Sequence, residues 1–510
     1  MNRAGGGRGG AAGVSPALAA AFLLAALTLW IAPNGFGGGA LDDQRYLEAA
    51  RAWVSAPPLV AETHWELRHT LTLPLAAWFA IAGESLAPFH LLPAFAWLLL
   101  LGISMAGLAR FAGEAPAIVF AGLFATTQLF HQFGTRFYPE IFELLFVAAS
   151  LWSFYLGAQA EAGRRWLVGA GVAAALAMLT RETSWYLPLL YAGLFVTGRP
   201  VPRAKLLWVA VGAVPLLAAE TLWLWAATGD PLHRAHVALN HVKVPTDQME
   251  GLVYEGAGGV LFNPEIGARW KDVGTFDVHW TVNPLLNLFA DIRYGLLFWL
   301  VGGLWIVGRG ERREAALPLG AILAVGLLSF AFANYVLMLP QRTRYYGFLA
   351  YAATIDGAIL ADRVLLKRGR RKLFGLAAAV QLVAGFLLVS TLRRDEALAD
   401  VAVPLIASVR EPVYADAATL AQLSFPLDIA DQRHKVIAGA APPGALALQV
   451  LKGGHGAAPA EVCCWRQEAA AAAPAPLPAK VGRLLGLVPA NKPPALSVRL
   501  VRRVGMQHRE

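Results

Sequence analysis

Charged residues and cysteines are both scarce in this chain of 510 residues. Only 15% of the residues are charged, whereas 57% are apolar, and the mean hydropathy is +0.51. This composition excludes an ordinary soluble domain and is typical of a protein that crosses a membrane many times. The two cysteines, Cys463 and Cys464, are adjacent. Neighbouring cysteines rarely pair, so the sequence predicts no disulfide framework, and it contains no zinc motif.

The formal charge of +9 does not indicate a nucleic-acid partner. The basic residues lie in short clusters between apolar runs, as expected for loops on the cytoplasmic side of a membrane. Residues 1–13, which are rich in glycine and contain Arg3 and Arg8, predict a flexible cytoplasmic tail. The sequence therefore predicts a multi-pass protein of the cytoplasmic (inner) membrane, with membrane lipid as a partner and no nucleic acid.

Residues 14–392 form the predicted transmembrane part, which contains about eleven spanning helices. With this number, every dense basic cluster between spans lies inside and the C-terminal tail lies outside. The predicted spans are Val14–Pro33, Pro88–Ala109, Pro116–Phe133, Ile141–Gly157, Trp166–Leu179, Ser184–Thr197, Leu206–Ala227, Ile292–Val307, Ala315–Leu339, Tyr345–Leu366 and Leu373–Leu392.

Two outer loops are predicted, over residues 34–87 and 228–290. In the first loop, apolar residues from Tyr46 to Val54 recur at helical spacing and predict an amphipathic helix on the membrane surface. The segment Thr70–Ala82 is shorter than the roughly twenty residues that cross a bilayer, and Pro74 interrupts it. It therefore predicts a re-entrant or interfacial helix.

The tail, residues 393–510, has a different pattern and predicts a small α/β domain outside the membrane. Four segments read as short strands, and Ala417–Leu423 reads as a helix between two of them. Ala469–Pro478 is predicted to be a linker or surface loop. The four strand segments are Pro412–Asp416, Lys435–Ile437, Ala445–Leu451 and Leu496–Val501.

This topology gathers ionisable side chains at the outer membrane face. Charged groups at membrane depth are costly, which makes them candidates for function. Arginine forks suit phosphate oxygens, and a carboxylate can act as a general base or hold a divalent cation. The candidates are Asp42, Asp43, Glu140, Arg181, Glu182, Arg342 and Arg344.

Each candidate also has a structural explanation. Asp42 or Asp43 would serve equally as a helix N-cap, and Glu140 as an acid that starts a helix. Arg181 and Glu182 would pair with each other in a turn. Arg342 and Arg344 would contact anionic lipid head groups.

Several motifs together resemble the GT-C fold membrane glycosyltransferases, which include protein O-mannosyltransferases, lipid A aminoarabinose transferases and oligosaccharyltransferases. The resemblance covers most of the membrane part. The motifs are Asp42-Asp43-x-x-Tyr46, the approach His64–His69 that contains Arg68, Pro139-Glu140, Thr180-Arg181-Glu182, Gly229-Asp230-Pro231-Leu232 and Arg342-x-Arg344-Tyr345.

The resemblance implies transfer of a sugar from a polyprenyl-phosphate or polyprenyl-pyrophosphate carrier to a glycan, lipid or protein acceptor. It implies that Asp42 or Asp43 is the catalytic base and that Glu140 is a second acid. Arg342, Arg344 and Tyr345 would bind the carrier phosphate, and Arg181, Glu182, Tyr46 and Arg68 would complete the substrate site. Because metal use varies in the superfamily, the resemblance assigns no cofactor firmly. It leaves open whether a divalent cation takes part in the reaction.

Two other functions stay open from the sequence. A lipid or sugar transporter or flippase would need polar residues in mid-span that line a path. Here the spans are almost purely apolar, and Asp356 is the main exception. A non-catalytic membrane scaffold would tolerate replacement of both Asp42 and Asp43.

Overall fold

The computed structural model describes residues 15–31, 41–160, 163–199, 201–239, 282–291, 294, 296–308, 319–337, 343–389, 397–452, 465–472 and 496–503. Several features that the sequence singles out lie outside these ranges. They are the tail 1–13, residues 240–281 of the second outer loop, Arg342, and the pair Cys463 and Cys464.

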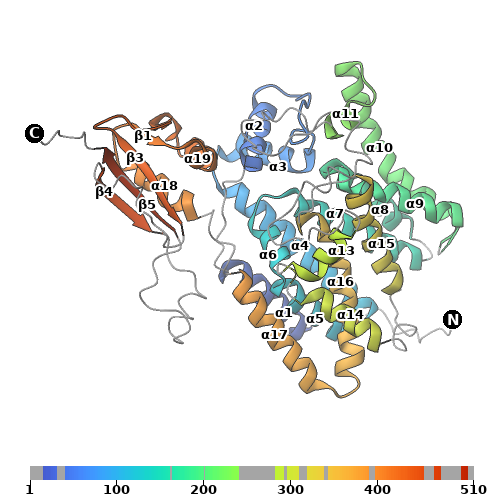
Figure 1. Cartoon of the computed structure of the whole chain (residues 1–510). Coiled ribbons are helices and arrows are strands. Elements are labelled where there is room, and N and C mark those ends of the chain that lie inside the picture. The colour runs from blue at the N-terminus through green and yellow to red at the C-terminus, as the bar shows by residue number, and fades with distance from the viewer. Residues whose placement is uncertain are drawn as a thin grey trace, which may run out of the picture.

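The membrane part is a bundle of helices (Figure 1). Its α-helices are α1 (Pro16–Ile31), α2 (Leu41–Ser55), α3 (His69–Ala82), α4 (Ala87–Phe111), α5 (Glu114–Thr126), α6 (Gln128–Thr135), α7 (Pro139–Gln159), α8 (Arg164–Thr180), α9 (Tyr186–Thr197), α10 (Arg203–Thr228), α11 (His233–Leu239), α13 (Asn283–Ala290), α14 (Leu297–Val307), α15 (Leu319–Ala331), α16 (Gly347–Leu360) and α17 (Arg371–Val389). Two 3₁₀ turns, η1 (Glu182–Trp185) and η7 (Thr343–Tyr346), precede α9 and α16, and π-helical turns η6 (Phe332–Val336) and η8 (Ala361–Leu366) follow α15 and α16.

Four stretches of helix among the described residues are long and apolar enough to cross a membrane. They are Ala87–Phe111, Pro139–Gln159, Arg203–Thr228 and Leu319–Val336. The chain is therefore a multi-pass membrane protein, whereas the number of eleven spans stays a prediction. The predicted span Pro116–Phe133 is divided, because Thr127 is extended (φ −83°, ψ 114°) and separates α5 from α6.

The short helix α3 has 14 residues and contains Pro74, so it is too short to cross a bilayer alone. It packs against α2, which carries Asp42 and Asp43 in its first turn. These two helices lie side by side at one end of the bundle, toward the C-terminal domain (Figure 1). The predicted surface helix and half-helix thus form one unit beside the spans.

Glycines allow α8 and α10 to cross in direct backbone contact. A Cβ atom at Gly171 would lie 1.9 Å from the Val209 carbonyl oxygen, and one at Gly212 would lie 2.1 Å from the Val168 carbonyl oxygen. Small residues at such crossings let helices in membranes approach closely. This crossing positions the end of α8, which is followed by Arg181 and the turn η1.

The C-terminal domain is a five-stranded mixed sheet with helices α18 (Ala397–Ala407) and α19 (Ala417–Ile429). The strand order is β2-β1-β3-β5-β4. β1 pairs in parallel with β2 and β3, whereas β5 pairs antiparallel with β3 and β4. The strands are β1 (Val413–Ala415), β2 (Val436–Ala438), β3 (Leu446–Lys452), β4 (Trp465–Ala472) and β5 (Leu496–Arg503).

Strands form at all four segments that the sequence predicts, and the predicted helix extends to Ile429. The prediction of a linker at Ala469–Pro478 is wrong for its first part, because Ala469–Ala472 belongs to β4. These alanines pair with Ser497–Leu500 of β5, so the neighbouring strand overrides the weak strand propensity of alanine.

Candidate active site

Asp42 lies in the first turn of α2 and has two partners from distant parts of the chain. Its Oδ1 accepts a hydrogen bond from Trp65 Nε1 at 2.9 Å, and its Oδ2 accepts one from Arg344 Nη1 at 3.3 Å. The side chain is 22% exposed. Asp42 is therefore held in place by two donors and still reachable by a substrate.

Arg344, in the turn before α16, links the two predicted acidic groups. Besides contacting Asp42, its Nε lies 3.3 Å from Glu140 Oε1. The guanidinium also lies over the rings of Tyr138 and Tyr345, at 5.5 and 5.4 Å from their centroids. Cation–π contacts and two carboxylates thus fix the plane of a guanidinium that remains 20% exposed.

Glu140 begins α7 and forms a buried ion pair with Arg181. Arg181 Nη1 lies 2.8 Å from Glu140 Oε1, and both side chains are 3% exposed. The guanidinium of Arg181 lies 4.4 Å from the centroid of the Tyr345 ring. Asp42, Arg344, Glu140 and Arg181 therefore form one continuous chain of alternating charge.

Tyr46 of α2 and Arg68, the residue before α3, extend this site. Arg68 Nη1 donates a hydrogen bond to the Tyr46 hydroxyl, and both side chains are buried. Burial alone would lower the pKa of Arg68, but Tyr46, Glu182 and Asp42 raise it overall. Arg68 is therefore a fixed positive charge whose field reaches Asp42.

The two adjacent aspartates differ in exposure. Asp42 is 22% exposed at its side chain, whereas Asp43 is only 3% exposed. Burial alone would raise the pKa of Asp42, but the charges of Arg344 and Arg68 and the hydrogen bond from Trp65 outweigh it and hold the pKa below its usual value. Asp42 is thus ionised at neutral pH and able to accept a proton.

Several site residues were missed by the sequence reasoning. Trp65 and Tyr138 contact charged site residues, but no spacing links Trp65 to Asp42, which lies 23 residues earlier. Glu143 could have been found, because it follows Glu140 by three residues on the same helix face. Its Oε1 accepts hydrogen bonds from Thr183 at 2.5 Å and Ser184 at 2.7 Å.

A small polar cavity adjoins Arg344. Glu140 Oε2 is buried and has no hydrogen-bond partner among the described residues. The cavity is lined by two carboxylic acids and a guanidinium. Its polar lining consists of Glu140, Glu143, Thr183, Tyr186, Ser329, Arg344 and Tyr345.

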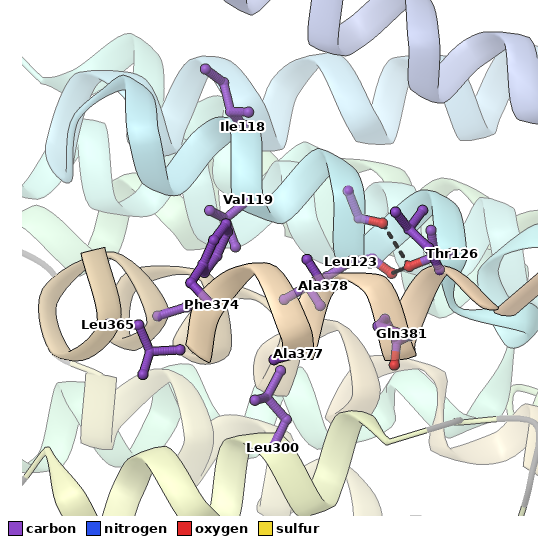
Figure 2. A pocket seen from close by; sticks show the side chains of 13 residues that line it. Ile118, Val119, Leu123, Thr126, Leu300, Leu365, Phe374, Ala377, Ala378 and Gln381 are labelled. Atoms are coloured by element: carbon purple, nitrogen blue, oxygen red, sulfur yellow. Dashed lines mark hydrogen bonds between the residues drawn. The ribbon is translucent and has the colours of Figure 1, made fainter. Parts of the chain in front are cut away.

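A larger groove of about 680 Å³ lies elsewhere, among α5, α14 and α17. Its lining is apolar apart from Thr126 and Gln381, which Figure 2 shows near one another. It contains none of the charged residues that line the small cavity.

A second polar cluster joins α11, in the second of the two predicted loops, to the helices beside the site. Arg234 of α11 donates hydrogen bonds to Glu220, to the Leu67 carbonyl at 3.2 Å and to the Met178 carbonyl at 2.9 Å. Glu220 Oε1 also lies 2.9 Å from His69 Nε2. One arginine thus joins α11 to α10, to the start of α3 and to the end of α8.

The described residues contain no group of three or more His, Cys, Asp or Glu side chains that could hold a metal ion. Among the described residues, Asp42 and Glu140 both pair with Arg344, and Glu140 also pairs with Arg181. No cofactor is assigned to the site.

A family model and solved structures are similar to this chain. The family model of dolichyl-phosphate-mannose-protein mannosyltransferases matches residues 71–225. No curated protein matches the sequence. The structure of ArnT from Cupriavidus metallidurans bound to undecaprenyl phosphate is 14% identical, with a TM-score of 0.52, and the match covers 96% of this chain and 98% of that one.

A second similar structure is the archaeal oligosaccharyltransferase AglB from Archaeoglobus fulgidus, in complex with an inhibitory peptide and a dolichol-phosphate. It is 12% identical, with a TM-score of 0.54, and the match covers 83% of this chain and 64% of that one. At such low identity the likeness concerns the fold. This chain has the GT-C fold of membrane glycosyltransferases, and its segment 71–225 matches the model of one of their families.

Proposed function

We propose that this protein transfers a sugar from a polyprenyl-phosphate or polyprenyl-pyrophosphate carrier to an acceptor hydroxyl, at the outer face of the cytoplasmic membrane. The observation that carries the proposal is the chain Asp42–Arg344–Glu140–Arg181, which brings a partly exposed carboxylate to 3.3 Å from a partly exposed arginine. A sugar phosphate needs both groups, because one must take a proton and the other must hold a leaving anion.

Asp42 is the catalytic base in this proposal. The carboxylate takes the proton of the acceptor hydroxyl, whose oxygen forms the new bond to the anomeric carbon. The bond between that carbon and the phosphate oxygen breaks, and the phosphate leaves with the electron pair. Attack opposite to the leaving group inverts the anomeric configuration.

Arg344 stabilises the leaving phosphate, with Arg342 as a second predicted donor. The bound phosphate would compete with Asp42 for the Arg344 guanidinium. Since Arg344 is one of the charges that lower the pKa of Asp42, its engagement by phosphate moves that pKa upward. Binding of the donor therefore makes Asp42 a stronger base at the moment of reaction.

Membrane-embedded relatives by fold support the choice of donor. The ArnT structure holds undecaprenyl phosphate and the AglB structure holds a dolichol-phosphate. The carrier chain would then lie between the membrane helices, with the phosphate at Arg344. The second outer loop would help to admit the acceptor, which is a glycan, a lipid or a protein.

The test is sugar transfer in membranes from a mixture of polyprenyl-linked donors, at equal amounts of folded protein. Asp42→Asn is expected to lower transfer by a factor of about 10² to 10⁴, the usual contribution of a positioned base. Asp43→Asn is the matched control and should retain a larger share of the activity. Wild-type transfer by Asp42→Asn would overturn the assignment of the base, and no transfer by wild type from any donor would favour a transporter or a scaffold.

A further inference from the structure

The C-terminal domain packs against α2, the helix that carries Asp42, and against the start of α4. Gln44 Nε2 of α2 donates a hydrogen bond to Asp428 Oδ2 of α19 at 3.0 Å. Phe425 of α19 lies edge-on to Phe89 at the start of α4, with ring centroids 4.6 Å apart. Figure 1 shows α19 on the side of its domain that faces α2 and α3.

The helix α19 has two apolar faces with different neighbours. Leu420, Leu423 and Leu427 belong to the core beneath the C-terminal sheet. Phe425 is 1% exposed and belongs instead to the core of the membrane part, against which Ile429 also packs. One helix therefore contributes side chains to two hydrophobic cores.

Phe425 is the first ring in an aromatic row that leads to the site. The ring centroids of Phe89 and Phe137 are 4.9 Å apart, and those of Phe137 and Tyr46 are 5.5 Å apart. Tyr46 in turn accepts the hydrogen bond from Arg68. Because such rings are close-packed, a displacement of Phe425 would displace the neighbouring rings as far as Tyr46.

We infer that α19 positions the first turn of α2, through Phe425 and Asp428, so that Asp42 faces Arg344. Phe425 and Asp428 are positioning residues and touch no reacting atom. The inference rests on the proposed function, because it assigns to the C-terminal domain a part in that same reaction. It explains why Gln44, two residues from Asp42, reaches a partner 384 positions away.

The test compares variants of the full chain in purified form. Phe425→Ala and Asp428→Leu are expected to lower kcat about 10- to 100-fold with little change in KM, because small misplacements of catalytic groups have effects of this size. Phe425→Leu and Asp428→Asn should recover most of the activity, since they keep an apolar wedge and an oxygen acceptor. Glu411→Gln is the matched control, because it removes an ion pair with Arg502 on the exposed sheet.

A second measurement separates this inference from the proposed function. Hydrogen exchange of the α2 amides, over residues 42–50, should quicken in Phe425→Ala and Asp428→Leu and stay unchanged in Glu411→Gln. If wild type transfers no sugar, the proposed function fails, and the exchange rates still test the positioning. Unchanged hydrogen exchange in both variants would overturn the inference. A raised KM at constant kcat would also overturn it, because that result would show that the domain binds substrate.

Discussion

Arg344 is shared between two carboxylates from different helices, and this sharing sets the charge of the site. Its guanidinium lies 3.3 Å from Asp42 and 3.3 Å from Glu140. Burial of Arg344 would lower its pKa, but Tyr345, Glu140 and Asp42 raise it well above its usual value. The arginine therefore keeps its positive charge at neutral pH.

Trp65 offers a way to test the protonation of Asp42. Trp65→Phe removes the hydrogen bond to Asp42 Oδ1, which is one of the contacts that lower the pKa of Asp42. The base must be ionised, so activity is lost as the pH falls through that pKa, and a raised pKa moves the loss to higher pH. We expect the acid limb of kcat/KM against pH to shift upward in Trp65→Phe. An acid limb at the wild-type position would mean that another group titrates.

The buried pair of Arg181 and Glu140 makes a prediction about stability. Arg181→Met leaves the Glu140 carboxylate buried without its closest cation. It is expected to lower the free energy of unfolding by about 3–5 kcal/mol. Arg181→Met combined with Glu140→Gln should lower the stability less, because the Glu140 charge that Arg181 neutralises is then removed as well. Thermal unfolding in detergent compares the two. If the double variant were less stable than the single one, the pair would not be the source of the loss.

At the scale of elements, the crossing of α8 and α10 places the turn that holds Arg181. Gly171→Ala would place a methyl group against the Val209 carbonyl and push the two helices apart. The free energy of unfolding is expected to fall by about 1–3 kcal/mol. Gly193→Ala in α9 is the control, because a Cβ atom there meets nothing within 4 Å. Thermal unfolding and sugar transfer should both fall in the first variant only. Equal behaviour of the two variants would contradict the crossing.

The sequence predicts those elements whose signals are local. Long apolar runs predict α4, α7 and α10, and the proline in a short run marks α3 as a half-helix. Strand β4 was missed, because its alanines form a strand only through pairing with β5. Likewise, the topology predicts that Asp42, Glu140, Arg181 and Arg344 share one face, whereas the contact of Trp65 with Asp42 depends on packing that no spacing encodes.

At the scale of the whole molecule, the orientation in the membrane follows from the basic clusters. The turn before α17 and the first residues of that helix form a basic cluster, and such clusters favour the cytoplasmic side. Its members are Lys367, Arg368, Arg370, Arg371 and Lys372. The acidic start of α2 is then expected outside. Both segments carry exposed residues that a thiol reagent can label after substitution by cysteine.

Thiol labelling tests this orientation in a background in which Cys463 and Cys464 are replaced by serine. Glu48→Cys, on the exposed face of α2, should react with a membrane-impermeant maleimide in intact cells. Arg368→Cys, in the exposed basic turn, should react only after the membrane is made permeable. The opposite pattern would invert the proposed topology and place the site on the cytoplasmic side.

The partners of Asp42 also set an order of events during synthesis. Asp42 and Arg344 are 302 positions apart, and the contact of Gln44 with Asp428 spans a still longer stretch. A growing chain therefore exposes its acidic loop long before the arginine that completes the site has left the ribosome. Polypeptides that stop before Arg344 would be inert toward lipid-linked sugars, so activity itself reports that synthesis has passed this residue.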